Sequence, residues 1–561
     1  MQSATDTPMG RAIREAYARG EEDETMPALH LVDATGAPMG LVDDGDSVIF
    51  YNIRGEREIE LSLSLTQPGF SEFPTKDAMT VRMATMIEYD PRITDHVAFP
   101  AQHEVTDTLS QVVSAAGLRQ AKVVESEKAV HITYFLNGKL KDPLPGEERV
   151  IIESNREVND FDELPQMNVA EVADATIARL QDPACTLIVA NFANMDVVGH
   201  IEDKAAVLRA IEAVDQAVGR VVRAAQEAGV VALVTADHGT VEKWYYPDGK
   251  VDTGHTNSQV PFVAVGAVGA VRQGGNLTDV APTVLNLLGL NVPEVMTGRP
   301  LVSVGQVTRP LAVPPVGQVT RPLVVPPVGQ AAGPSDDETG LVTRPTEHRV
   351  LLLIADGWGL NDDASANLIT QANTPNLDWL LTHFPWAPLQ ASGRPVGMPD
   401  GTVGNSEAGH LHIGAGRTVP SDRLRIADAI SDGSFRSNPA FNWAIDEAAR
   451  GGNKLHLLGI ISFYSSHGSV QYLEELLRLC AERGVRDVYI HGLLGRRGER
   501  PESGAAYVAD VEKLCADLGV GRVVSVIGRH WALDREEHWE RVEKAYRLLA
   551  FGEGLPVGGA A

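Results

Sequence analysis

VVALVTADHG, residues 230–239, joins a short apolar run to two side chains that can bind a metal ion. The run is rich in β-branched residues and indicates a buried strand, so Asp237 and His238 stand where a strand ends and a loop begins. Open α/β sheets bind their ligands at this edge. The alternative is an aspartate that caps the next helix beside a surface histidine, and this stretch alone leaves both interpretations open.

Two further apolar runs are each followed by an acid. Residues 349–354 precede Asp356, and residues 187–190 precede Asp196. If the three runs are neighbouring strands of one parallel sheet, their carboxylates converge on its carboxyl edge. Together with three nearby histidines they make a nitrogen and oxygen set sufficient for two divalent ions of the manganese or zinc type. The histidines are His200, His238 and His255.

Strand-like and helix-like segments alternate from about residue 103, which indicates a mainly parallel sheet with helices on both faces. We expect strands at 130–135 and 186–190 and a long amphipathic helix over 204–229. After residue 348 the same alternation returns, with helices at 473–483 and 537–549 and strands at 487–491 and 522–527. The predicted fold class is therefore α/β in both halves of the chain.

Composition limits the classes of partner. The chain has 561 residues, of which 43% are hydrophobic and 22% charged, enough for two or more soluble domains. A formal charge of -27 disfavours nucleic acid and anionic membranes, and no run of about 18 apolar residues occurs. Its three cysteines are far apart, as is typical of a reducing cytosol. We expect a monomeric cytoplasmic protein that binds neither nucleic acid nor membrane.

Residues 302–347 differ in character from the rest. The segment VGQVTRPLAVPP, residues 304–315, recurs almost unchanged at residues 316–327. Proline this dense prevents a helix or a central strand, so we predict an extended linker. A proline ligand for an adaptor domain is the second interpretation.

Two other motifs have a structural and a functional interpretation. Arg54 and Arg57 follow a strand-like run, share one helix face by their spacing, and suit either a phosphate or ordinary surface ion pairs. Ser406 lies in GNSEAGH, residues 404–410, and is either a helix cap or a nucleophile whose alkoxide a metal stabilises. Neither motif decides between these interpretations by itself.

Four motifs taken together resemble those of a known family. They are DGWG at 356–359, GNSEAGHLHIGAGR at 404–417, NFANMDVVGH at 191–200 and TADHG at 235–239. The family is the cofactor-independent (2,3-bisphosphoglycerate-independent) phosphoglycerate mutases, a branch of the alkaline phosphatase superfamily. The resemblance implies an isomerase of glycolysis that interconverts 3- and 2-phosphoglycerate through a phosphoserine. It implies two divalent metal ions, manganese first with zinc or cobalt as alternatives, and no 2,3-bisphosphoglycerate.

The order of these motifs is circularly permuted relative to the family, whose chains begin with the strand before DGWG. The proline repeat would join the family's natural end to its natural start. The resemblance implies an alkaline-phosphatase-like metal domain from residues 103–301 and 348–420, separated by the linker 302–347. It implies a second α/β domain, the transferase domain, assembled from residues 1–102 and 421–561.

Site residues follow from the resemblance position by position. One metal ion would be bound by Asp196, His200 and His255. The other would be bound by Asp237, His238, Asp356 and Ser406. Ser406 would also be the catalytic nucleophile that accepts the phosphoryl group. The residues that would hold the phosphorylated substrate are Arg54, Arg57, Lys128, His467, Arg497, Arg529 and Arg535.

Two departures from the family's motifs affect the expected reaction. Phe463 and Gly498 stand where the family has acids, and the acid replaced by Gly498 is thought to move protons at the glycerate hydroxyls. A positioned acid-base group contributes about 10² to 10⁴-fold to such a reaction. A phosphomonoester hydrolase or a mutase for another phosphorylated small molecule is therefore the alternative function. A metal-binding scaffold that uses the proline repeat is the third.

Overall fold

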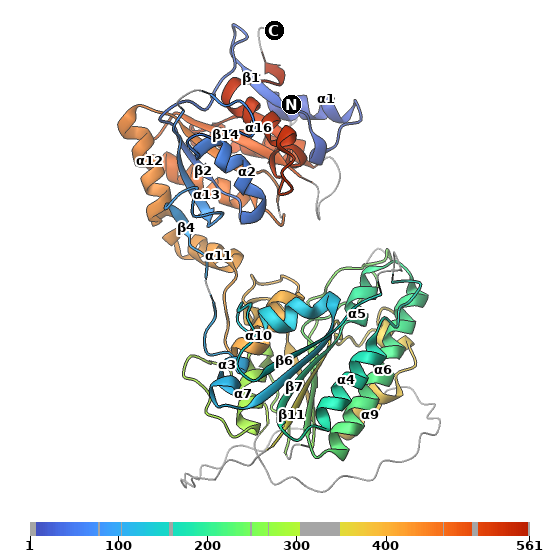
Figure 1. Ribbon diagram of the computed structural model, residues 1–561. Helices are drawn as coiled ribbons and strands as arrows, with labels where there is room; N and C mark the ends of the chain where they lie inside the picture. Colours follow the sequence, from blue (N-terminus) through green and yellow to red (C-terminus); the bar gives the residue numbers. More distant parts are fainter. Residues whose placement is uncertain are drawn as a thin grey trace. The chain divides into compact units, whose positions relative to one another are not determined.

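The structure is a computed structural model of two compact units (Figure 1). The terminal unit comprises Met1–Gln102 and Asp422–Ala561, and the middle unit comprises His103–Ser421. The described residues are 7–76, 79–102, 104–155, 161–246, 249–266, 269–302, 348–463, 465–495 and 503–558. The expected linker lies outside the described residues from 303 to 347.

The middle unit is built on one eight-stranded sheet with the strand order β10-β12-β9-β8-β11-β7-β5-β6. Its strands are β5 Arg119–Glu125, β6 Glu147–Ile152, β7 Cys185–Phe192, β8 Val231–Thr235, β9 Val260–Val265, β10 Gly275–Asn276, β11 Val350–Ala355 and β12 Trp386–Gln390. β11 lies between β7 and β8 and is parallel to both, which confirms the predicted neighbourhood of the three apolar runs. Antiparallel pairs occur where β9 joins β8 and β12.

Helices cover both faces of this sheet, as the alternating pattern predicted. They are α3 Leu109–Ala115, α4 Val169–Leu180, α5 Asn194–Val197, α6 Lys204–Glu227, α7 Val280–Leu287, α8 Leu368–Gln371, α9 Pro375–His383 and α10 Ser406–Ala415. Figure 1 shows α4, α6 and α9 on one face and α3, α7 and α10 on the other. α6 begins where the Asp203 side chain accepts from the first backbone N–H groups, and it ends just before Gly229, whose φ is 66°.

The strand expected at residues 130–135 is wrong. Residues His131–Phe135 form a π-helix, which packs against α10. Within it, the Thr133 hydroxyl donates to the Ala129 carbonyl 2.7 Å away, as a helical side chain can. A short apolar, β-branched run does not distinguish a strand from a buried helical turn, and here tertiary packing decides.

The terminal unit has a second eight-stranded sheet, ordered β16-β1-β15-β14-β13-β2-β3-β4. Its strands are β1 Leu29–Val32, β2 Ser47–Phe50, β3 Arg82–Ile87, β4 Val97–Phe99, β13 Leu455–Ile460, β14 Val488–Leu494, β15 Arg522–Gly528 and β16 Leu555–Gly558. Every pair is parallel except β1 with β15. β1 lies between β15 and β16, and β2 pairs with β13, so strands from both ends of the chain form one sheet and share one hydrophobic core.

Eight α-helices flank this second sheet in the described part of the chain. They are α1 Pro8–Tyr17, α2 Gly55–Thr66, α11 Asp422–Asp432, α12 Pro439–Gly451, α13 Val470–Glu482, α14 Gly504–Leu518, α15 Arg529–Ala532 and α16 Trp539–Phe551. Among all described helices of the protein, none combines the length and the apolar character needed to cross a membrane. The two mostly parallel sheets confirm the α/β fold class.

A buried polar chain crosses the sheet of the terminal unit. His456 Nε2 lies 3.0 Å from Asp46 Oδ2, and its Nδ1 lies 2.9 Å from His491 Nε2. The chain ends where His491 Nδ1 lies 2.7 Å from Ser525 Oγ. Burial lowers the pKa of both histidines, so they are neutral in the fold. Burial opposes ionisation of Asp46, but His456 and two backbone N–H groups lower its pKa to about 2.

These pKa shifts predict an acid-sensitive terminal unit. The unfolded chain binds protons on both histidines near pH 6.5, so the stability they give the fold is lost as pH falls below that value. The stability that Asp46 contributes through its lowered pKa is retained near pH 6.5 and is lost only below about pH 4. The free energy of unfolding of the wild type should fall between about pH 7.5 and pH 5.5. In the variant His491→Gln it should fall by about 1.4 kcal/mol less over the same range. Urea unfolding at the two pH values measures this difference.

Ser525→Ala is the matched control for His491→Gln. It removes the hydroxyl that His491 contacts but keeps both imidazoles, so it should lower the free energy of unfolding equally at both pH values. Equal pH dependence in wild type and His491→Gln would contradict the prediction.

Candidate functional site

Three strand ends place three acids at one edge of the middle unit's sheet. Asp237 follows β8, Asp356 follows β11, and Asp196 lies in the short α5 just after β7. All three are buried. Gly357 allows this approach, because its φ is 88° and a Cβ there would lie 2.9 Å from the backbone nitrogen of Asp196. The alternative of a capping aspartate beside a surface histidine is wrong, since His238 is fully buried.

One group of potential metal ligands consists of Asp196, His200 and His255. The Nε2 atoms of His255 and His200 lie 3.1 and 3.5 Å from Asp196 Oδ1. The two Nε2 atoms are 3.2 Å apart. A carboxylate oxygen and two imidazole nitrogens at this separation can bind one divalent cation.

The second group contains the other four predicted ligands. His238 Nε2 lies 2.9 Å from Ser406 Oγ, 3.3 Å from Asp237 Oδ2 and 3.5 Å from Asp356 Oδ1. Ser406 is the first residue of α10, and Asn405 is the N-cap, whose side chain accepts from Ala408 N at 2.8 Å. The interpretation of Ser406 as the helix cap is therefore wrong. Its hydroxyl faces the acidic cluster instead.

The backbone fixes which nitrogen of each histidine faces the cluster. His200 Nδ1 lies 2.6 Å from Thr253 O, His238 Nδ1 lies 3.2 Å from Gly239 O, and His255 Nδ1 lies 3.2 Å from Gly404 O. Because a carbonyl oxygen can only accept, each Nδ1 carries a proton. Each Nε2 then presents a lone pair to the carboxylates, which is the tautomer that a metal ligand requires.

The residues present fit divalent cations. Both carboxylate oxygens of Asp237 are buried and accept no hydrogen bond from the described residues, which is costly unless a cation compensates. Burial raises the pKa of Asp356, and the neighbouring Asp237 raises it further. Carboxylates crowded in this way, opposite imidazole nitrogens, are typical of sites for manganese or zinc. The buried groups of His and Asp are consistent with divalent metal binding.

Lys128 lies within the same cluster. Its Nζ is 2.6 Å from Asp196 Oδ2, 3.0 Å from Asp356 Oδ1 and 2.6 Å from Ser406 Oγ. Burial opposes its charge, but the acids Asp356 and Asp196 raise its pKa above the ordinary value. A positively charged ammonium therefore lies against the Ser406 hydroxyl.

His410 and Asn191 belong to this cluster, and the sequence did not single them out. His410 Nδ1 lies 2.8 Å from Ser406 O and 3.3 Å from Asp237 Oδ2. The Asn191 amide lies 3.1 Å from His410 Nε2 and donates to Asp356 Oδ2 at 2.9 Å. The available signal was spacing, because residue 410 is four after Ser406 and shares its helix face.

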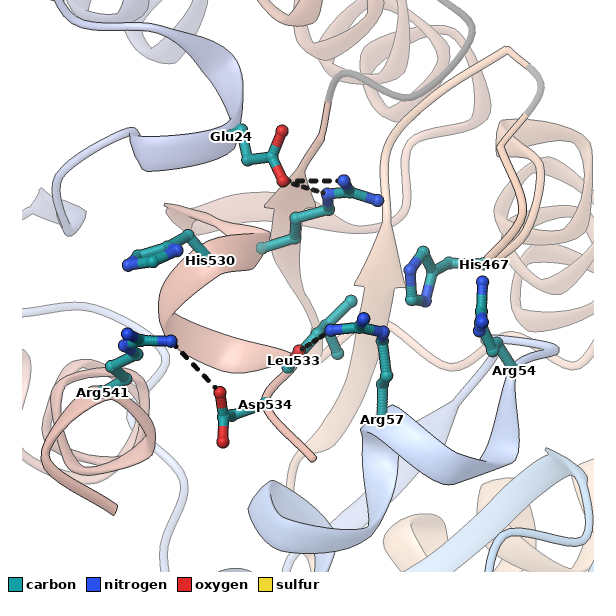
Figure 2. Close-up of a pocket in the computed structure, with 9 residues that line it drawn as sticks. Glu24, Arg54, Arg57, His467, His530, Leu533, Asp534 and Arg541 are labelled. Carbon is teal, nitrogen blue, oxygen red and sulfur yellow. Dashed lines mark hydrogen bonds and ion pairs between the residues drawn. The ribbon is translucent and has the colours of Figure 1, made fainter. Parts of the chain in front are cut away.

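The terminal unit contains a cationic pocket of about 310 Å³. It lies where several parallel strands end, because Arg54 follows β2, His467 follows β13 and Arg529 follows β15. Its lining residues are Glu24, Arg54, Arg57, His467, Arg529, His530, Leu533, Asp534 and Arg541. Figure 2 shows the side chains of Arg54, Arg57 and His467 close together on one side.

Arg57 is the guanidinium in this pocket that lacks a carboxylate partner in the described part of the chain. It donates to Leu533 O at 3.2 Å. Burial lowers its pKa, and Arg535, Arg54 and Arg529 lower it further by repulsion. Cations crowded in this way favour an anionic ligand.

The other predicted substrate residues differ in placement. Arg54 and Arg529 line the pocket but are paired with Glu56 and Glu24 at 2.8 and 2.7 Å. Arg535 does not line it, and it reaches Glu56 at 2.8 Å. Arg497 and Gly498 lie outside the described residues. Phe463 is described and is 68% exposed.

Four polar residues of the pocket carry no motif that predicts them from the sequence. They are Glu24, His530, Asp534 and Arg541. His530 is adjacent to Arg529 in the sequence, and Arg541 comes early in α16. Proximity to Arg529 and Arg535 in the sequence could have suggested His530, Asp534 and Arg541, whose convergence depends on how α15 and α16 pack. Glu24 has no such signal, because it lies near the other end of the chain.

Fold and site thus define a two-unit α/β protein with a candidate divalent-metal centre. Residues 15–292 match the model of the Metalloenzyme superfamily. Residues 426–558 match that of the BPG-independent PGAM N-terminus, iPGM_N. The first match includes Asp196, Asp237 and three histidines of the centre, whereas Asp356 and Ser406 lie between the two matches.

Among curated proteins, the chain is similar to 2,3-bisphosphoglycerate-independent phosphoglycerate mutases. That of Pseudomonas aeruginosa is 41% identical over 297 residues, which are 52% of this chain and 57% of that protein. That of Thermomicrobium roseum is 40% identical over 307 residues, 53% of this chain and 58% of that protein. A solved structure of Leishmania mexicana phosphoglycerate mutase at low cobalt concentration matches with a TM-score of 0.35 and 28% identity, over 49% of this chain and 53% of that one. The chain spans a little over half the length of the curated relatives it matches.

The contacts of His410 predict a role in orienting metal ligands. His410→Gln should lower the affinity for Mn²⁺ about 10 to 100-fold, because groups that orient metal ligands typically have effects of this size. Calorimetric titration of the full chain with Mn²⁺ measures the affinity directly.

His412→Gln is the matched control on the same helix. His412 is also buried, but its ring nitrogens contact Ala408 O at 2.7 Å and Val419 N at 3.0 Å, outside the cluster. Its replacement should leave Mn²⁺ affinity unchanged. An equal loss in both variants would indicate general destabilisation of α10 and refute the specific role of His410.

Proposed function

We propose that the protein is a phosphoglycerate mutase that interconverts 3- and 2-phosphoglycerate through a phosphoserine at Ser406. The observation that carries this proposal is the position of the Ser406 hydroxyl, 2.9 Å from His238 Nε2 and 2.6 Å from Lys128 Nζ, against three buried carboxylates. The similarity to curated mutases at about 40% identity supports it.

The middle unit would perform the phosphoryl transfer. Asp196, His200 and His255 would hold one divalent ion, manganese being our first choice. Another would be held by Asp237, His238, Asp356 and Ser406, whose side chains lie together. When bound, such ions act as Lewis acids that neutralise phosphate charge and favour the serine alkoxide. Lys128 would neutralise a phosphate oxygen beside Ser406 Oγ and so favour attack on phosphorus.

The terminal unit would retain the glycerate during the reaction. Its pocket offers Arg57 without a carboxylate partner, and a planar guanidinium suits a substrate carboxylate or phosphate. A mutase must keep this intermediate bound, because release of glycerate would make the enzyme a hydrolase. Arg54, Arg529 and His467 line the same pocket and would help to hold it. Arg497 and Arg535 stay predictions of the resemblance.

The two units would correspond to a transferase domain and a phosphatase-like metal domain in circularly permuted order. The description of the iPGM_N match supports this, since a model of an N-terminus matches residues 426–558, after the Metalloenzyme match at 15–292. The interleaving of β2 with β13 in one sheet shows that strands from both ends of the chain complete the terminal unit. The permuted order would then require only a new connection through residues 302–347.

A phosphomonoester hydrolase, or a mutase for another phosphorylated small molecule, is the second candidate. The observation that favours it is the absence of an acid at Phe463, whose side chain is exposed, and at Gly498. Without a residue that moves protons at the glycerate hydroxyls, the phosphoserine would be attacked by water.

The proposed activity predicts a sharp dependence on Ser406. With Mn²⁺ and 3-phosphoglycerate, the wild type should form 2-phosphoglycerate, and Ser406→Ala should lower kcat at least about 10³-fold because the nucleophile is lost. Mass spectrometry of the quenched reaction should locate phosphate on Ser406. The exposed neighbour Glu407 provides the control variant Glu407→Gln, which should stay active. Release of inorganic phosphate without 2-phosphoglycerate would contradict the mutase and favour the hydrolase.

The permuted order predicts that the peptide connection through residues 303–347 is dispensable once the chain has folded. A protease site inserted there and then cleaved should leave one complex, because β11 on one fragment pairs on both sides with β7 and β8 of the other. Size-exclusion chromatography and the mutase assay compare the cleaved protein with the uncleaved insertion. Separation of the fragments would contradict the prediction.

A further inference from the structure

A buried carboxylate lies directly behind the cationic pocket. Glu58, on α2, is fully buried, and its Oε1 accepts from the Asn52 amide at 2.8 Å and lies 3.1 Å from His467 Nδ1. Asn52 in turn accepts from the backbone of Ile460 at 2.8 Å, which ties Glu58 to the end of β13. The carboxyl group is therefore held in place from two strands of the sheet.

His467 joins this carboxylate to the pocket. Its backbone N–H donates to Ser465 Oγ at 3.0 Å, and its carbonyl accepts from Ile53 N at 2.7 Å, so the ring is anchored. The ring lines the pocket beside Arg54 and Arg57 (Figure 2). With the Nδ1 proton directed at Glu58, the other nitrogen, Nε2, has a lone pair and no hydrogen-bond partner in the described part of the chain.

The other titratable groups of the pocket are less suited to move a proton. Glu24 accepts from Arg529 Nε and Nη2 at 3.2 and 2.7 Å, and Asp534 pairs with Arg541 at 3.3 Å. Burial opposes ionisation of Asp534, but backbone N–H groups and His538 lower its pKa, which makes it a weak base. His530 has no carboxylate within ion-pair distance in the described residues to orient its ring.

We propose that His467 is the catalytic residue that moves the proton at the substrate hydroxyls, and that Glu58 is its positioning residue. This inference rests on the proposed mutase function. The carboxylate fixes the tautomer and stabilises the imidazolium, as an acid behind a catalytic histidine does in other enzymes. The pair would supply the acid-base function that Phe463 and Gly498 cannot provide.

Protons are conserved over the two phosphoryl transfers. In the first, the Ser406 alkoxide bonds to phosphorus, the bond from phosphorus to the ester oxygen breaks, and that oxygen takes the proton from protonated His467 Nε2. In the return transfer, the second hydroxyl oxygen bonds to phosphorus, the bond to Ser406 Oγ breaks, and the hydroxyl proton passes to Nε2. The imidazolium and the alkoxide are both regenerated, and no other reactant is consumed.

Steady-state kinetics with Mn²⁺ and 3-phosphoglycerate test the two roles. His467→Asn should lower kcat by about 100-fold or more, the size expected for a general acid-base group. Glu58→Gln keeps the shape of the side chain and should lower kcat while leaving KM unchanged. His530→Asn removes the other histidine of the pocket and should lower kcat far less than His467→Asn. A kcat loss in His530→Asn equal to that in His467→Asn, or a KM effect alone in Glu58→Gln, would overturn the proposal.

Nitrogen-15 NMR of histidines in the full chain gives a readout that is independent of turnover. At about pH 8, where an ordinary histidine is neutral, His467 should carry its proton on Nδ1, and Glu58→Gln should change this tautomer preference. Addition of 3-phosphoglycerate should shift the Nε2 signal. If the wild type forms no 2-phosphoglycerate, the proposed function fails, but the NMR result still decides on the pair. A proton on Nε2, or no response of Nε2 to 3-phosphoglycerate, would overturn it.

Discussion

The parallel pairing of β11 with β7 and β8 is the constraint on which the candidate metal centre depends. Ile354 of β11 is in register with Asn191 on one side and Thr235 on the other, so Asp356 follows at the level of Asp237. A shift of one residue in this register would turn the buried side chains of β11 to the opposite face. All six residues of β11 are buried, so the register is fixed by packing on both faces.

The sequence predicts the acids of this centre better than their surroundings, for a physical reason. A buried parallel strand can be recognised from its apolar sequence alone. A polar residue directly after such a strand, as Asp356 after the strand that ends near Ile354, lies at the edge of the sheet where ligands bind. His410 and Asn191 have no such mark, because their contacts depend on how α10 packs. The π-helix at His131–Phe135 was mistaken for a strand because its residues favour both structures. In the other pocket, the spacing of Arg54 and Arg57 indicated a possible anion site. The other predicted residues of that site came only from the resemblance, since the pocket joins segments from both ends of the chain.

The two candidate sites have opposite electrostatic demands. In the middle unit, neither oxygen of Asp237 accepts a hydrogen bond from the described residues, which favours a bound cation in addition to Lys128. In the terminal unit, repulsion among guanidiniums adds to burial in lowering the pKa of Arg57. The phosphorylated hydroxy acid and the divalent cations of the proposed function would satisfy both demands, whereas a metal-binding scaffold would account for only one of them.

The local charge of the pocket is compatible with the proposed binding of a small anion by so acidic a chain. Its formal charge is -27, yet at physiological ionic strength charges beyond about 8 Å are largely screened. Within that distance Glu24 is held by Arg529 and Asp534 by Arg541, which leaves the guanidinium of Arg57 for the ligand. A small anion gains this local attraction, whereas a polyanion would extend over the acidic surface and be repelled. The charge distribution thus agrees with the small substrate of the proposed function.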